Sequence, residues 1–133
     1  MNWRPPDRED RQVAVLWAVC AGLAVALRPL WLASVPLIPA CPWHVMTGWP
    51  CPGCGTTRAI VHLLHAEVPS AFRFNPLAAS AAIGFVFGGL AAPAWIACGG
   101  KTPRLRTGVR PAGFAVVALA VLLNWAWLYA SGV

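Results

Sequence analysis

Charged side chains are scarce in this sequence. They make up 11% of its 133 residues, with only four acidic residues, while 59% of the residues are hydrophobic. Soluble domains carry roughly 25% charged residues. A chain this short has a high surface-to-volume ratio, so it has too little interior to hide that much apolar surface from water. We therefore exclude a water-soluble domain and predict an all-α integral membrane protein, a single membrane domain over residues 1–133.

Motifs for DNA or RNA binding are also missing. The net charge of +6 is therefore interpreted as a topology signal and as attraction to anionic lipids. The expected partners are membrane lipids, with another membrane protein or a second copy of the chain as further candidates. No nucleic acid is expected.

Long uncharged runs predict three transmembrane helices, because about 20 apolar residues cross the hydrocarbon core of a bilayer. A cleaved signal peptide ending near Ala33-Ser34 is the alternative for the first run. The predicted order is a flexible N-terminal arm (1–11), a first span (13–33), a cysteine loop (41–55), an interfacial helix (56–66), a second span (76–98), a basic loop (101–110) and a third span (112–131).

The short helix at 56–66 has a polar stripe. The helical period places Arg58, His62 and His65 on one side of it. A helix too short to span, with one polar face, is typical of an interfacial or re-entrant segment. These three residues are the candidates for binding an anion or a lipid headgroup.

Small residues recur at every fourth position of the second predicted span. Ser80, Gly84, Gly88 and Ala92 predict a groove in which another helix can approach closely. Pro93 predicts a kink near the end of this helix.

The positive charges are distributed unevenly. Seven of the ten cations lie in the N-terminal arm and the 101–110 loop, and three lie between residues 28 and 73. The cation-rich side of a membrane protein is usually cytoplasmic. We therefore predict a multi-pass protein of the cytoplasmic (inner) membrane, with the N-terminus in the cytoplasm and the cysteine loop outside it.

Three of the five cysteines are clustered in the 41–55 loop. Cys41-x2-His44 is followed after six residues by Cys51-x2-Cys54, a spacing that offers four ligands to one tetrahedral zinc ion. The other two cysteines, Cys20 and Cys98, lie in apolar runs and are expected to be small buried residues.

Two other interpretations of this cluster remain open. Cys41 can form a structural disulfide with Cys51 or Cys54, which a location outside the cytoplasm favours. The three thiols can also form a redox centre, because a Cys-x-x-Cys motif at a helix N-terminus lowers a thiol pKa.

Several short motifs together resemble one bacterial membrane family. It is the domain-of-unknown-function family two-seven-five-two, which has a CPxCGxTR signature, and the resemblance covers about residues 35–90. The motifs are Cys51-Pro-Gly-Cys-Gly-Thr-Thr-Arg-Ala59, Cys41-Pro42, Leu63-Leu64 and Asn75-Pro76-Leu77.

The resemblance implies a small integral membrane protein and supplies no reaction. It singles out Cys41, Cys51, Cys54, Arg58 and Asn75. His44 is not part of the signature. Ala66 stands where the family tends to have glycine before an acidic residue, here Glu67.

The expected function is non-enzymatic: a membrane scaffold or accessory subunit with a zinc-stabilised knuckle. A thiol-redox protein is the first alternative. A lipid-headgroup-binding or -processing protein using Arg58 is the second, and it ranks last because the chain has no paired carboxylates and little beyond His62, His65 and Glu67 to act as a general base.

Overall fold

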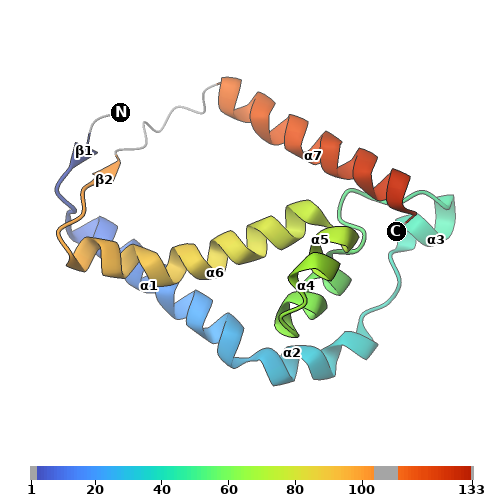
Figure 1. Ribbon diagram of the computed structural model, residues 1–133, viewed down its shortest axis with the longest axis horizontal. Coiled ribbons are helices and arrows are strands. Elements are labelled where there is room, and N and C mark those ends of the chain that lie inside the picture. Colours follow the sequence, from blue (N-terminus) through green and yellow to red (C-terminus); the bar gives the residue numbers. More distant parts are fainter. Residues whose placement is uncertain (1–2, 104–110, 133) are drawn as a thin grey trace. The chain divides into compact units, whose positions relative to one another are not determined.

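The computed structural model describes residues 3–103 and 111–132, and its regular structure is almost entirely helical (Figure 1). The elements in chain order are β1 (Trp3–Arg4), α1 (Arg8–Ala26), α2 (Arg28–Ser34), the 3-10 turn η1 (Val35–Leu37), α3 (Pro42–Thr47), α4 (Thr56–Leu64), α5 (Val68–Phe74), α6 (Pro76–Ala97), β2 (Thr102–Pro103) and α7 (Pro111–Ser131). The predicted all-α class is confirmed, with a short antiparallel pair between β1 and β2. Arg104, Arg106 and Arg110 of the predicted basic loop lie outside the described residues.

Two of the described helices are long and apolar enough to cross a membrane. They are α6 and the Gly113–Ser131 part of α7, and the pair Arg8–Ala26 and Arg28–Thr47 passes the same test only as one span bent by 58°. The predicted first span, 13–33, therefore contains a break. Pro29 explains the break, because proline has no backbone N–H and its ring clashes with the preceding helical turn.

The helix α1 begins inside the segment that the sequence predicts to be a flexible arm. The Asp7 carboxylate accepts a hydrogen bond from the Asp10 N–H at 2.9 Å, and the Asp10 carboxylate accepts one from the Asp7 N–H at 3.2 Å. This reciprocal pair is a capping box, which satisfies backbone donors that the first helical turn leaves free.

The described residues divide into two compact units, one within Met1–Arg28 and Ile83–Val109 and the other within Pro29–Ala82 and Arg110–Val133. In the first unit, α1 packs on α6 through small residues. A Cβ added to Gly89 would lie 2.7 Å from the Cβ of Ala21, and one added to Gly88 would lie 2.6 Å from the Trp17 ring. Close helix approach through glycine is the usual packing mode within membranes.

The core of the second unit is built from alanines. Ala59 of α4, Ala71 of α5 and Ala79 of α6 are fully buried, and Leu63 and Phe74 pack against them. The helices α4 and α5 lie side by side as a short hairpin (Figure 1). Small side chains let the three helices approach one another, which brings the end of the cysteine loop close to the start of α6.

The turn between α4 and α5 shows why glycine would be favoured at the position that Ala66 occupies. Glu67 N–H donates to the His62 carbonyl at 2.8 Å and Ala66 N–H donates to the Leu63 carbonyl at 2.9 Å, the two bonds of a Schellman C-cap. Ala66 takes the left-handed conformation that this cap requires, with φ of 63°. Glycine adopts this conformation without strain, whereas alanine does not.

Candidate metal centre

The cysteine loop is shaped by two tight turns. Cys41 directly precedes α3, which runs from Pro42 to Thr47 and is capped by Gly48 with φ of 72°. The second turn, Cys51 to Cys54, is closed by a hydrogen bond from the Cys54 N–H to the Cys51 carbonyl at 2.9 Å. Gly55, with φ of 76°, then turns the chain into α4. Gly48 lies between Cys41 and Cys51, and its positive φ lets the chain turn back after α3, so that Cys51 returns to Cys41.

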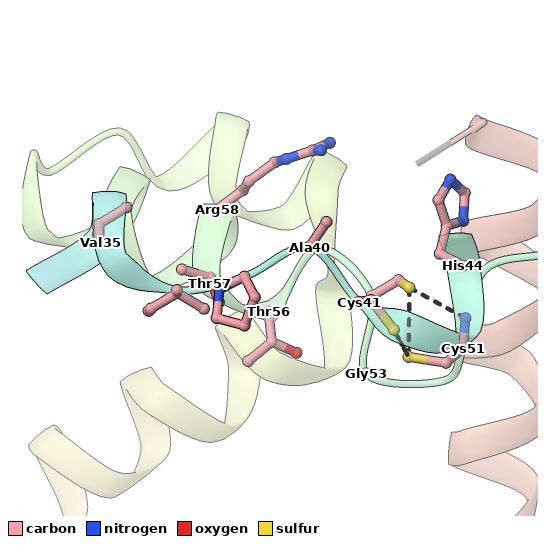
Figure 2. A pocket seen from close by; sticks show the side chains of 13 residues that line it. Val35, Ala40, Cys41, His44, Cys51, Gly53, Thr56, Thr57 and Arg58 are labelled. Atoms are coloured by element: carbon pink, nitrogen blue, oxygen red, sulfur yellow. Dashed lines mark hydrogen bonds between the residues drawn. The ribbon is translucent and has the colours of Figure 1, made fainter. Parts of the chain in front are cut away.

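The three sulfur atoms converge at one point, as Figure 2 shows. The Sγ atom of Cys51 lies 3.5 Å from that of Cys41 and 3.3 Å from that of Cys54. All three sulfurs lie within 4.8 Å of one another, and the cysteines are free. Ligands on tetrahedral zinc, with Zn–S of about 2.3 Å, are separated by about 3.8 Å. The cluster needs only a small expansion to hold a metal ion.

The environment distinguishes the thiols from one another. Burial raises the pKa of Cys54 to about 11, and the hydrogen bond with the Cys51 thiol is the second largest cause of this rise. The pKa of Cys41 is lowered, mainly by a hydrogen bond from the backbone N–H of His44 and next by one with the Cys51 thiol. The Cys51 N–H also donates to the Cys54 Sγ atom at 3.1 Å. Backbone donors of this kind stabilise a thiolate once a metal has displaced its proton.

His44 does not join the three sulfurs. Its nitrogens are absent from the group of metal-binding atoms found in the described residues, and Figure 2 shows its ring projecting from α3 away from the cysteines. It does line a cavity of about 390 Å³ that the cysteines also border. His44 as a fourth ligand therefore stays a prediction.

Asn75 connects the cysteine loop to α6. Its side chain is buried, and its Nδ2 atom donates to the Cys54 carbonyl at 2.9 Å while its Oδ1 atom accepts from the Ala78 N–H at 2.9 Å. The second bond is an N-cap, which satisfies a free donor in the first turn of α6. One amide side chain thus caps a candidate transmembrane helix and holds the backbone of a candidate metal ligand.

Asn124 of α7 forms a second connection between the cysteine loop and the start of α6. Its Oδ1 atom accepts from the Leu77 N–H at 3.0 Å and its Nδ2 atom donates to the Pro52 carbonyl at 3.2 Å. Beside it, the Trp125 Nε1 atom donates to the Pro50 carbonyl at 2.8 Å. The sequence analysis did not identify either Asn124 or Trp125 as a support of the cysteine loop. The sequence did hold a signal for Asn124: it is a polar side chain within an uncharged predicted span. A polar side chain is costly inside a membrane unless it is hydrogen-bonded.

The predicted polar stripe of α4 divides in two. Arg58 is exposed and lies 5.7 Å from the Phe74 ring, and the His62 ring stacks on the same Phe74 at 5.0 Å. The His62 Nδ1 atom lies 2.6 Å from a carboxylate oxygen of Glu67. His65 is apart from them, with its Nδ1 atom 2.9 Å from the Val61 carbonyl. Anion or lipid binding by these residues stays a prediction.

The predicted groove of α6 is used only in part by the described residues. Gly88 lies against Trp17, but a Cβ on Gly84 would meet nothing within 4 Å. The hydroxyl of Ser80 donates to the Pro76 carbonyl at 2.7 Å. Helix packing by Ala92 stays a prediction.

Cys20 and Cys98 are outside the metal-binding group. Both side chains are exposed, that of Cys20 on α1 and that of Cys98 in the turn that follows α6. The expectation that they are buried is therefore wrong, because a membrane helix presents apolar residues to lipid as well as to the protein interior. Their exposure makes them useful controls for thiol chemistry at the cluster.

Comparison with known proteins supports the motif analysis. No curated protein and no solved structure is similar enough to this chain to count as a match. A family model matches the part of the chain that runs from the first clustered cysteine into α6. That family, matched over residues 41–89, is described as "Protein of unknown function (DUF2752)", and it is the membrane family that the sequence motifs resemble.

Proposed function

We propose that this chain is a small scaffold or accessory subunit of the bacterial inner membrane, without enzymatic activity, whose cysteine knuckle binds zinc. Cys41, Cys51 and Cys54 would supply thiolates, with His44 as the predicted fourth ligand. Thiolates and imidazole are the donors that zinc prefers in structural sites. The knuckle would lie outside the cytoplasm and order a surface for another membrane protein or a second copy of the chain, with lipid around the helices.

One observation carries this proposal. The three thiols converge in a loop whose carbonyl groups are held by side chains from the membrane helices: Cys54 by Asn75, and Pro52 and Pro50 by Asn124 and Trp125. Groups that hold the backbone of metal ligands tune metal affinity. A metal in the loop would therefore stabilise the packing of α6 and α7 around it, which is what a scaffold needs.

Metal analysis of the purified protein tests the proposal. We expect about one zinc ion per chain, because the described residues form one cysteine cluster. The substitution Cys54→Ser should remove the metal and lower the free energy of unfolding. Cys20→Ser is the matched control, since this exposed thiol lies outside the cluster, and it should change neither quantity. A metal-free wild-type protein with unchanged stability in chelator would refute zinc binding.

A thiol-redox function is the second candidate, favoured by three free thiols at sulfur separations of 3.3 and 3.5 Å. In this function a Cys51 or Cys54 thiolate attacks the disulfide of a partner protein and releases one partner thiolate. Cys41 then attacks the mixed disulfide, which leaves an oxidised pair in this chain and a second reduced thiol on the partner.

The redox candidate makes a distinct prediction. The thiols should cycle with dithiothreitol and an oxidised disulfide. Cys41→Ser should accumulate the mixed disulfide because its resolving thiol is missing, whereas Cys51→Ser should fold normally and, where Cys51 is the attacking thiol, trap none. Zinc that stays bound through such cycles would exclude this function.

A further inference from the structure

The three clustered sulfurs open onto a cavity rather than onto a closed interior. The cavity has a volume of about 390 Å³ and lies within the second unit, and its wall includes Cys41, Cys51 and Cys54 on one side and Thr57 and Arg58 of α4 on another. Figure 2 labels Cys41, Cys51, Thr57 and Arg58 among the side chains that line this cavity. A metal bound by the three thiolates would therefore be reachable by a small molecule.

The donors number one fewer than zinc requires. Zinc in proteins is usually four-coordinate, and sites with three protein ligands keep a position for an exogenous one. Within the described part of the chain, three donor atoms lie within 4.8 Å of one another, and no histidine nitrogen or carboxylate oxygen completes the group. Cys51 and Cys54 are fixed by a four-residue turn and Cys41 by the start of α3, so the protein determines three ligand positions and leaves the fourth toward the cavity.

The charges around the cavity indicate which charge an external ligand would carry. Arg58 is the one permanently charged side chain among the lining residues, and none of them is acidic. Zinc with three thiolates has a net charge of −1, so an added anion is repelled unless a nearby cation offsets it. Arg58 can supply that offset from the rim of the cavity, because its guanidinium is exposed and is held beside Phe74.

We propose that the metal centre takes its fourth ligand from outside the chain, and that this ligand is a small anion with one donor atom, such as a thiolate, held with the help of Arg58. The inference rests on the proposed binding of zinc by the three cysteines, and it puts an external ligand in the fourth position in place of His44. This inference extends the proposed function, because it makes the knuckle a centre that responds to a ligand instead of a closed structural site.

Cobalt substitution tests this inference on the purified full-length chain in detergent. Co²⁺ replaces zinc in such sites, and its visible absorption bands report the ligand set. Azide serves as the anionic probe and imidazole as the neutral probe. We expect azide to shift the bands of the cobalt protein in a saturable way. His44→Ala should leave the starting spectrum and the azide titration unchanged.

Two arginine variants test the charge argument. Arg58→Ala should weaken azide binding by about twofold to fivefold, the range for a single exposed charge pair, and this loss should shrink in high salt because exposed charges are screened. Arg73→Ala is the matched control, since Arg73 is exposed on α5 and does not line this cavity, and it should not change azide affinity. Imidazole, being neutral, should bind equally to all three proteins.

The outcomes separate this inference from the proposed function. A cobalt spectrum that ignores azide but changes in His44→Ala would overturn the inference and make His44 the fourth ligand, with zinc binding intact. Equal azide affinity in the wild type and Arg58→Ala would overturn the assigned role of Arg58. Failure of cobalt and zinc to bind in stoichiometric amount would instead refute the proposed function.

Discussion

Replacing Asn124 by leucine tests whether α7 supports the cysteine loop. Asn124 is 4% exposed, and its side chain joins the Leu77 N–H of α6 to the Pro52 carbonyl of the loop. Leucine has a similar size and is more favourable in a membrane span. A loss of stability in Asn124→Leu can therefore be assigned to the two hydrogen bonds, and not to poorer membrane insertion.

The size of the effect follows from what each bond is worth. Side-chain hydrogen bonds within membrane proteins contribute about 0.6 kcal/mol on average and up to about 1.7 kcal/mol. Leaving two buried groups unsatisfied therefore costs about 1–3 kcal/mol. If the whole loss of stability is felt by the zinc-binding form of the loop, zinc affinity falls by about fivefold to 150-fold, since a factor of ten corresponds to about 1.4 kcal/mol.

Two measurements check this prediction. Unfolding in mixed micelles of increasing SDS content, followed by tryptophan fluorescence, gives the change in stability. Competition with a zinc-binding dye gives the change in zinc affinity. The control is Ala126→Leu, which adds the same side chain at an exposed position two residues further along α7. It should behave as the wild type in both measurements.

Two results would refute the reasoning. Wild-type stability in Asn124→Leu would mean that its two hydrogen bonds contribute nothing. Lower stability with unchanged zinc affinity would mean that Asn124 supports only α6 through Leu77, and that the loop does not depend on α7. The double variant with Cys54→Ser separates these cases, because residues acting through one network give non-additive effects.

Three further predictions follow from the backbone, the helix packing and the thiols. Ala66→Gly should raise the free energy of unfolding by about 1 kcal/mol, because it relieves a left-handed alanine, as measured by unfolding in SDS. Gly89→Ala should lower stability by about 1–3 kcal/mol, the usual cost of overpacking, whereas Gly84→Ala, in open space, should not. In metal-free protein, iodoacetamide should label Cys41 before Cys54 when followed by mass spectrometry near pH 8, because burial keeps Cys54 protonated until the pH approaches its pKa of about 11.

Each of these predictions has a contrary outcome. Unchanged stability in Ala66→Gly would mean that the cap carries no strain. Equal stability of the two glycine variants would contradict close packing of α1 on α6 at Gly89. Labelling of Cys54 that is as fast as that of Cys41 would show that the loop opens readily without metal.

The sequence by itself determined the class of protein and its candidate site. Charge depletion and uncharged runs of span length were sufficient to predict membrane helices, because the hydrocarbon core imposes a length and an apolar composition on any segment that crosses it. The Cys-x2-Cys motif and the earlier Cys41 were sufficient to single out the cluster, because metal ligands depend on residue type and spacing. The family resemblance over the same residues agrees with the match at 41–89.

Only the tertiary structure decided how the cluster is supported. Asn75 and Asn124 are separated by 49 positions in the chain, and no local pattern indicates that both hold carbonyl groups of one loop. It also showed that His44 stands apart from the sulfurs and that Gly89 rather than Gly84 packs against another helix. Such contacts depend on which faces of distant helices meet, and helical periodicity specifies a face without specifying its partner.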